Sequence, residues 1–146
     1  MIKNVLSVLA FLLVGAAVVG LLFTHHLFAR NPLLIAIQVA AALLMIWARK
    51  TFGLRSFHAA ASTSRGGLVT TGPYRYIRHP LYASLVLLAW GAALKGAGVF
   101  SLLFALCASG LLYVACYQEE LENLERFGES YDAYMERTKM LIPGIL

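Results

Sequence analysis

Four apolar stretches separated by polar segments dominate the pattern of the chain. They cover residues 5–24, 33–48, 80–94 and 99–117. A helix that crosses a bilayer needs about 20 mainly apolar residues. The pattern therefore predicts an all-α integral membrane protein with about four transmembrane helices. The third stretch is shorter than the others, so we expect it to tilt into contacts with its neighbours.

Lysine and arginine are distributed unevenly about these four stretches. If all four cross the membrane, ten basic residues lie on one side: Lys3, Arg49, Lys50, Arg55, Arg65, Arg75, Arg78, Arg126, Arg137 and Lys139. Only Arg30 and Lys95 lie on the other side. Basic residues concentrate on the cytoplasmic side of membrane proteins. We therefore expect a multi-pass protein of a bacterial-type inner membrane, with both termini and the loop 49–79 in the cytoplasm.

Composition agrees with one membrane domain covering residues 1–146. The mean hydropathy is +0.75 and 13% of the residues are charged, against about 25% in soluble domains. Because membrane topology explains the net charge of +5, we expect no nucleic-acid partner. Cys107 and Cys116 lie in one apolar run and are expected to act as small buried hydrophobes. No spacing of metal-ligand residues is present, so no metal is expected.

The C-terminal segment predicts a cytoplasmic amphipathic helix over about 119–138. Its stripe at helical spacing consists of Tyr117, Glu120, Leu124, Phe127, Tyr131 and Tyr134. Core packing or an interface-lying helix explains Phe127 and Tyr134 best. Glu119 and Glu120 differ, because a carboxylate pair at the end of a membrane span is costly without a partner. Their expected partners are a cation, an arginine or ligand hydroxyl groups.

The loop before the third span carries the densest polar chemistry, in the sequence GPYRYIRHPLY from Gly72 to Tyr82. Proline fits the first turn of a helix, and the residue before a proline is kept out of helical geometry. His79 is therefore expected just outside the third span, beside Arg78. That position makes His79 a candidate ligand-binding residue, although a lone histidine usually has a structural role.

These residues carry a resemblance to a known family. The run LVTTGPYRYIRHPLY, followed by a tail of the form EE-L-FG-Y-Y-RT-IP, resembles the isoprenylcysteine carboxyl methyltransferase family. The related phospholipid N-methyltransferases of membranes share its core. The similar part runs from about Phe52 to Pro143. One position departs from the common pattern, because Ser84 stands where the family usually has glycine.

The resemblance implies a membrane methyltransferase that uses S-adenosyl-L-methionine and releases S-adenosyl-L-homocysteine. The cofactor residues that it implies are Gly66, Gly67, Leu68, Val69, Tyr74, His79, Pro80, Leu81, Tyr82 and Glu119. The catalytic residues that it implies are Glu120 and Arg137. Methyl transfer requires mainly that nucleophile and methyl carbon are held in line at short distance. The expected acceptor is lipophilic or membrane-associated and enters from the bilayer. Membrane lipids are the other expected partners.

Other functions remain open on the sequence alone. A phospholipid N-methyltransferase is the first alternative, and its amine acceptor would need a base such as Glu120 to remove a proton. A non-enzymatic membrane or lipid-binding subunit is a second. Membrane steroid reductases, which use a nicotinamide cofactor, lack this form of the RHP motif. The acceptor and the oligomeric state do not follow from the sequence.

Overall fold

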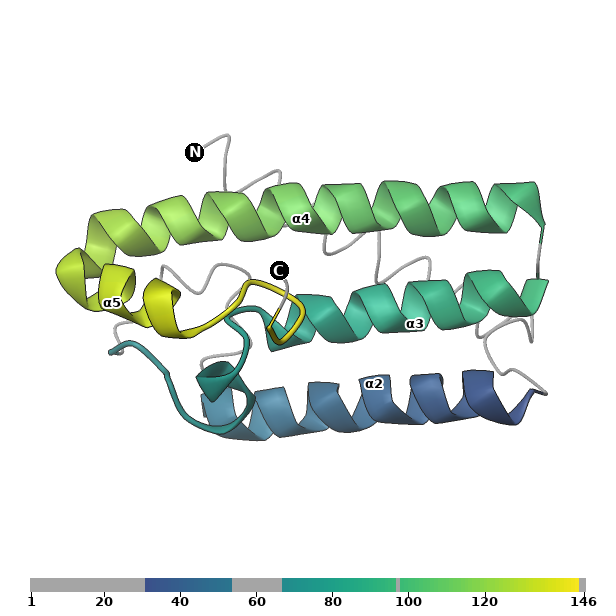
Figure 1. Ribbon diagram of the computed structural model, residues 1–146, viewed down its shortest axis with the longest axis horizontal. Coiled ribbons are helices and arrows are strands. Elements are labelled where there is room, and N and C mark those ends of the chain that lie inside the picture. The colour runs from purple at the N-terminus through teal and green to yellow at the C-terminus, as the bar shows by residue number, and fades with distance from the viewer. Residues whose placement is uncertain (1–30, 54–66, 97, 145–146) are drawn as a thin grey trace.

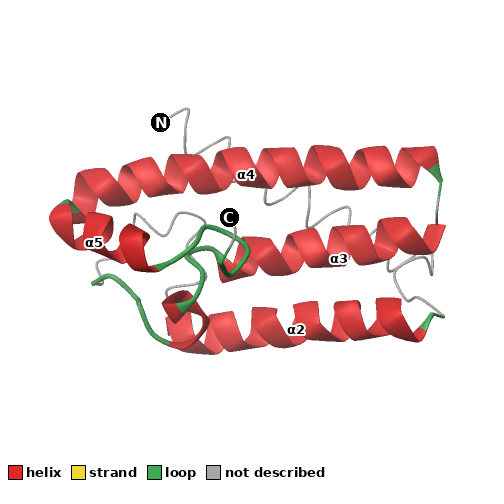
Figure 2. Ribbon diagram, in the orientation of Figure 1, coloured by secondary structure: helices red, strands yellow, loops and turns green. Residues whose placement is uncertain are grey.

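The structure is a computed structural model, which describes residues 31–53, 67–96 and 98–144. These residues form four α-helices and one 3-10 turn, and their only β feature is an isolated bridge (Figure 2). The elements are α2 (Pro32–Phe52), η3 (Gly72–Arg75), α3 (Pro80–Gly96), α4 (Val99–Phe127) and α5 (Glu129–Arg137). The helical prediction is thus confirmed for this part of the chain. The predicted span 5–24 lies outside the described residues.

Three long helices lie side by side, with α3 between α2 and α4 (Figure 1). Asn31 starts α2, since its side chain accepts a hydrogen bond from the backbone N–H of Leu33 at 2.9 Å. Small residues line the contact between α3 and α4, among them Ala89, Ala93 and Ala105. Small side chains let membrane helices approach closely.

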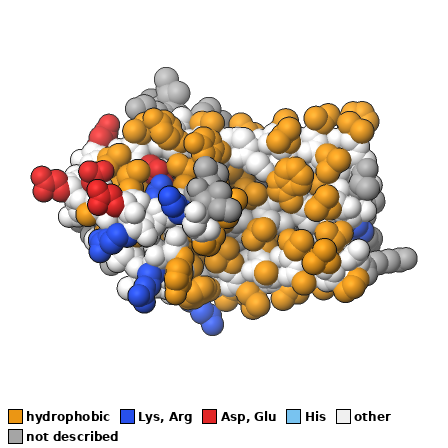
Figure 3. Space-filling model, in the orientation of Figure 1, with side chains coloured by type: hydrophobic (Ala, Val, Ile, Leu, Met, Phe, Trp, Pro, Cys, Tyr) orange, Lys and Arg blue, Asp and Glu red, His pale blue; other side chains and the backbone are white. Residues whose placement is uncertain are grey.

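Two of these helices, α2 and α4, are long and apolar enough to cross a membrane. Only 17% of the apolar window of α2 and 28% of that of α4 are buried inside the protein. Leu33 is 68% exposed and Phe100 is 89% exposed. Apolar side chains cover the length of the bundle, whereas most charged side chains gather at one end (Figure 3). This surface fits an integral membrane protein, while the count of four spans stays a prediction.

The single tail helix predicted over about 119–138 is divided in the structure. Helix α4 continues from Val99 past the predicted end of the span at 117 to Phe127, and α5 covers Glu129–Arg137. The break comes at Gly128, which has φ +53° and donates its backbone N–H to the oxygen of Leu124 at 2.9 Å. Glycine adopts a positive φ without the steric cost that a side chain would add, and so allows this break. The shorter helix α5 then folds back beside the end of α4 (Figure 1).

A tight turn at Gly72 connects the polar loop to the end of α2. Gly72 has φ +59°, and a Cβ atom there would lie 2.9 Å from Thr51 Cγ2 and even closer to Thr51 Oγ1. The Thr51 hydroxyl itself donates to the backbone oxygen of Trp47 at 2.9 Å. The loop can therefore approach α2 only because this residue has no side chain.

We predict that Gly72→Ala destabilises the protein by at least about 1–2 kcal/mol, the cost of a left-handed backbone for an L-residue. Displacing Thr51 would add to this cost. Gly110→Ala is the matched control, because a Cβ atom at Gly110 meets nothing within 4 Å. The measurement is thermal melting in detergent. Equal melting temperatures for the two variants would contradict the close approach at Gly72.

Candidate functional site

A buried ion pair joins the polar loop to α4. Arg78 Nε donates to Glu120 Oε1 at 2.5 Å, and the two side chains are 9% and 5% exposed. The same guanidinium donates from Nη1 to two backbone oxygens, of Met135 at 3.2 Å and of Thr138 at 2.6 Å. The arginine partner expected for this carboxylate pair is therefore present.

His79 lies between the two carboxylates of α4. Its Nδ1 is 3.4 Å from Glu119 Oε2, and its Nε2 is 3.3 Å from Glu120 Oε1. His79 is 5% exposed, and its Nε2 is buried without a well-formed hydrogen bond to any described residue. Tyr82, one turn into α3, donates its hydroxyl to Glu119 Oε1 at 2.8 Å. Glu119 is thus held from two sides.

The charge state of His79 follows from these neighbours. Burial by itself would lower its pKa, but Cys116 and the carboxylates of Glu119 and Glu120 raise the pKa well above the usual value of 6.5. His79 is therefore protonated at neutral pH. Tyr74 behaves differently, because burial raises the pKa of its phenol and keeps it neutral.

The tail fixes the backbone of the polar loop. Ile77 and Lys139 form a parallel bridge, with Arg78 N donating to Lys139 O at 2.8 Å. His79 N donates to Met140 O at 3.0 Å. The local geometry expected from Pro80 is also present, since the His79 backbone oxygen accepts from Ala83 N at 3.0 Å in the first turn of α3.

A further contact involves the aromatic stripe of the tail. Tyr134 is buried and donates its hydroxyl to the backbone oxygen of Tyr74 at 2.6 Å. The Tyr74 ring in turn lies 5.5 Å from the ring of Phe52 at the end of α2. Tyr134 is therefore a packing residue, as predicted, and it also connects α5 to the loop.

The structure brings together four of the residues selected from the sequence: His79, Tyr82, Glu119 and Glu120. Pro80 is buried and Leu81 half-buried in the first turn of α3. Arg137 does not join this cluster, because its side chain is exposed and its Nε donates to Ala133 O in the same helix at 2.9 Å. No described hydrogen bond joins Arg137 to a residue of the cluster.

The described residues before η3 have no regular secondary structure. Gly67 is exposed, and Leu68 and Val69 are half-buried. Gly66 lies outside the described residues. Their assignment to a cofactor remains a prediction. Among the described residues, no group of three or more His, Cys, Asp or Glu side chains is arranged to hold a metal ion.

Two components of the cluster were not identified from the sequence. Cys116 is fully buried beside His79 rather than serving only as a core residue. Its position three and four residues before Glu119 and Glu120 places all three on one side of a helix, which is a usable signal. The backbone oxygens that receive Arg78 carry no sequence signal. Cys107, also expected to be buried, is exposed on the apolar surface.

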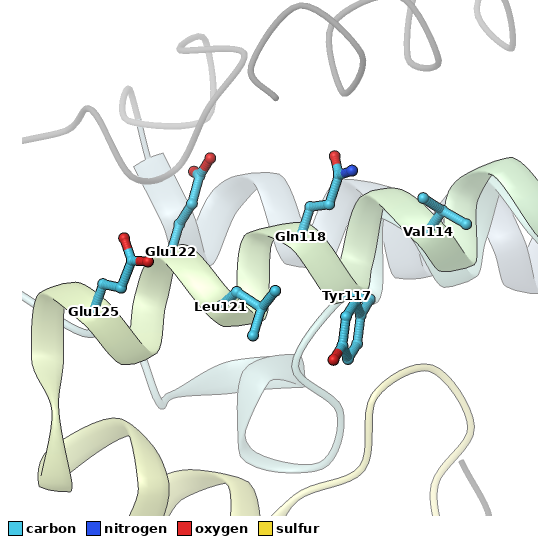
Figure 4. A pocket seen from close by; sticks show the side chains of 6 residues that line it. All are labelled: Val114, Tyr117, Gln118, Leu121, Glu122 and Glu125. Atoms are coloured by element: carbon cyan, nitrogen blue, oxygen red, sulfur yellow. The ribbon is translucent and has the colours of Figure 1, made fainter. Parts of the chain in front are cut away.

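An open hollow of about 200 Å³ lies on another face of α4. Its lining consists of Val114, Tyr117, Gln118, Leu121, Glu122 and Glu125 (Figure 4). Gln118 and Glu122 point to the same side of the helix in that view. None of the residues of the His79 cluster lines this hollow. The chemistry-bearing cluster and the hollow are therefore separate features.

An apolar helical bundle with a buried ionic cluster at one end is typical of an integral membrane protein that has a polar site. Comparison with known families then identifies the chain. A family model described as phospholipid methyltransferase matches residues 28–130, so the chain belongs to the phospholipid methyltransferase family. No solved structure matches the chain.

Similar proteins of known name include two from Bradyrhizobium diazoefficiens. Methanethiol S-methyltransferase 1 is 36% identical over 70 residues, which are 48% of this chain and 24% of that protein. Methanethiol S-methyltransferase 2 is 37% identical over 97 residues, which are 64% of this chain and 37% of that protein. The protein-S-isoprenylcysteine O-methyltransferase of Schizosaccharomyces pombe is 37% identical over 79 residues, which are 53% of this chain and 34% of that protein.

The resemblance to the isoprenylcysteine methyltransferases is therefore confirmed. The matched segments span about a quarter to just over a third of the length of these relatives.

We predict that His79→Gln loses stability in a pH-dependent way. The raised pKa means that protonated His79 stabilises the folded state fully below about pH 6.5, and that this stabilisation is lost as the pH rises through the folded-state pKa. Near pH 6 the variant should lose about 3–5 kcal/mol, as when one partner of a buried pair is removed. Melting from pH 6 to 9 should show the difference from wild type shrinking. A constant difference would contradict a protonated His79.

Proposed function

We propose that the protein is an S-adenosylmethionine-dependent methyltransferase of the membrane that methylates a lipophilic or membrane-associated acceptor. The observation that carries this proposal is the buried cluster of His79, Tyr82, Glu119 and Glu120 at one end of an apolar bundle. A purely structural bundle has no need for such a cluster, because each buried charge is expensive to desolvate. Membership of the family adds independent support.

The donor set of the cluster fits the methyl donor. S-Adenosylmethionine has an ammonium group and ribose hydroxyls that donate hydrogen bonds, and a carboxylate that accepts them. Glu119, which is held by Tyr82 and His79, offers acceptor oxygens. His79 is protonated and faces Glu119 with Nδ1 and Glu120 with Nε2, so it holds these carboxylates in place for the ammonium and hydroxyl groups of the methyl donor. Tyr74 offers a neutral aromatic surface.

The charges of the residues in the cluster indicate what each residue would do. The bound cofactor supplies an electrophilic methyl group on a sulfonium, for in-line displacement. His79 is already protonated at neutral pH, so it acts as a cation and hydrogen-bond donor rather than as a base. Glu120 is held by Arg78 and orients His79 from the other side. The apolar helices exclude water beside the cluster, which strengthens its electrostatic interactions.

We propose a lipophilic thiol as the first acceptor to test. Two of the similar proteins are named methanethiol S-methyltransferases, and a thiol is small and needs few polar contacts. As its sulfur takes the methyl group and the donor leaves as a thioether, the thiol proton would pass to a carboxylate of the cluster or to water. An isoprenylcysteine carboxylate is the next acceptor, suggested by the fission-yeast relative. Phosphatidylethanolamine is the third, suggested by the family description. Each would reach the cluster from the bilayer.

We predict that the detergent-purified protein binds S-adenosylmethionine and S-adenosylhomocysteine with dissociation constants in the micromolar range. Glu119→Ala and His79→Ala should each weaken binding at least tenfold, because each removes a buried charge-assisted partner worth about 1.5–3 kcal/mol. Isothermal titration calorimetry measures this directly.

Glu122→Ala is the matched control for Glu119→Ala. It removes a carboxylate from the same helix, but from the face of the hollow. Its affinity should stay within twofold of wild type. If the folded wild-type protein binds neither ligand in detergent or in native lipid, the methyltransferase proposal is wrong.

We further predict that radiolabelled S-adenosylmethionine transfers its methyl group to hexanethiol in preference to phosphatidylethanolamine or N-acetyl-S-farnesylcysteine. The three acceptors are compared at equal concentration in the same vesicles. Transfer to phosphatidylethanolamine alone would instead assign the phospholipid activity. Transfer to the farnesylcysteine alone would assign the carboxyl methyltransferase activity.

A further inference from the structure

We propose that Arg78 is a positioning residue that fixes the Glu120 carboxylate against the C-terminal end of α5. In this arrangement the tail of the chain sets the geometry of the site. The inference deepens the proposed function and rests on it for the effect on ligand binding. Its structural half, the attachment of the tail, can be tested separately.

The guanidinium of Arg78 is shared between two elements. Arg78 Nε donates to Glu120 on α4, while Nη1 donates to the backbone oxygens of Met135 and Thr138 at the end of α5. The last carbonyls of a helix have no partner within the helix. A cation at that end also interacts favourably with the helix dipole. Arg78 therefore donates hydrogen bonds to the end of α5 and to Glu120 at the same time.

The surrounding contacts also hold the polar loop and the tail together. The backbone of 76–79 pairs with that of 139–140, and the Tyr134 hydroxyl bonds to Tyr74 O. The loop therefore cannot move away from the tail without breaking both sets of contacts. Glu120 is held in turn, because its partner Arg78 belongs to this loop.

The position of Glu120 affects His79, which is one of the residues proposed to bind the cofactor. Glu120 Oε1 is 3.3 Å from His79 Nε2, so the position of this carboxylate bears directly on the imidazolium assigned to the cofactor. Two of the donor atoms of Arg78 are already occupied by protein acceptors. Arg78 thus acts on the site through Glu120 and His79.

Lysine cannot reproduce this arrangement. Its ammonium is a compact point charge, whereas the guanidinium is a planar fork whose donors point in fixed and different directions. A lysine at position 78 can approach Glu120 or the end of α5, but it cannot bridge both with the observed geometry. Arg78→Lys is therefore a test that keeps the charge and removes the bridge.

The experiment compares wild type, Arg78→Lys, Glu120→Gln and the double variant. S-Adenosylhomocysteine affinity is measured by calorimetry, and amide hydrogen exchange is measured over residues 133–140. Arg78→Lys should weaken affinity at least tenfold in the wild-type background, but less than threefold in the Glu120→Gln background. The exchange protection of the tail should fall in Arg78→Lys and persist in Glu120→Gln.

Arg75→Lys is the matched control, because Arg75 is an exposed arginine of the same loop. It should change neither affinity nor exchange. An equal loss of affinity from Arg78→Lys in both backgrounds would mean that Arg78 does not act through Glu120, and would overturn the proposal. Unchanged protection of the tail in Arg78→Lys would also overturn it.

Two further outcomes remain interpretable. If wild type binds no S-adenosylhomocysteine, the proposed function fails, and the exchange data still decide whether Arg78 attaches the tail. If Arg78→Lys does not elute as a single folded species, Glu120→Gln alone decides. It should keep the protection of the tail and lose at least tenfold in affinity, and unchanged affinity would overturn the proposal.

Discussion

A carboxylate pair at the end of an apolar helix is the constraint on which the rest of the structure depends. Glu119 and Glu120 follow directly on the apolar part of α4, where unpaired charges are costly. The fold meets this cost with Arg78, His79 and Tyr82, which all come from one short run before and within α3. The resulting cluster is nearly balanced in charge, since two carboxylates face one guanidinium and one imidazolium.

The bundle supplies the geometry that this pairing needs. Small residues bring α3 and α4 close enough for Tyr82 to reach Glu119. Gly72 allows the loop to turn against the end of α2, and Gly128 turns the chain back so that α5 can meet the loop. The site is thus formed at the point where the loop, the helix ends and the tail converge, rather than by any one helix.

The chain belongs to the phospholipid methyltransferase family, and we propose that this cluster binds the methyl donor. The same arrangement explains how a membrane protein could bind a water-soluble donor and a lipophilic acceptor. Most charged side chains gather at one end of the bundle, and apolar side chains cover the rest of the face shown in Figure 3. A protonated His79 gives the site a buried cation.

Much of this was accessible from the sequence. Hydrophobic periodicity and length predicted the helices, because a membrane helix is recognised by its composition alone. Pro80 correctly placed His79 at the mouth of α3, since proline restricts its own turn and the residue before it. The cost of the glutamate pair correctly predicted a cationic partner. In contrast, the break at Gly128 was missed, because the aromatic stripe continues in register through it.

Local sequence by itself thus determined the helical class and that Arg78, His79 and the glutamate pair are polar residues at the ends of apolar helices. Only the tertiary structure decided the partners. The pairing of Arg78 with Glu120 and with the oxygens of Met135 and Thr138 joins residues 42 to 60 positions apart. Every residue has the same backbone oxygen, so no sequence pattern marks the oxygens that will accept a hydrogen bond from Arg78. Exposure of Arg137 and burial of Tyr134 on the same short helix were likewise fixed by how α5 packs. A helix presents every side of its surface, and only its neighbours in space determine which side is buried.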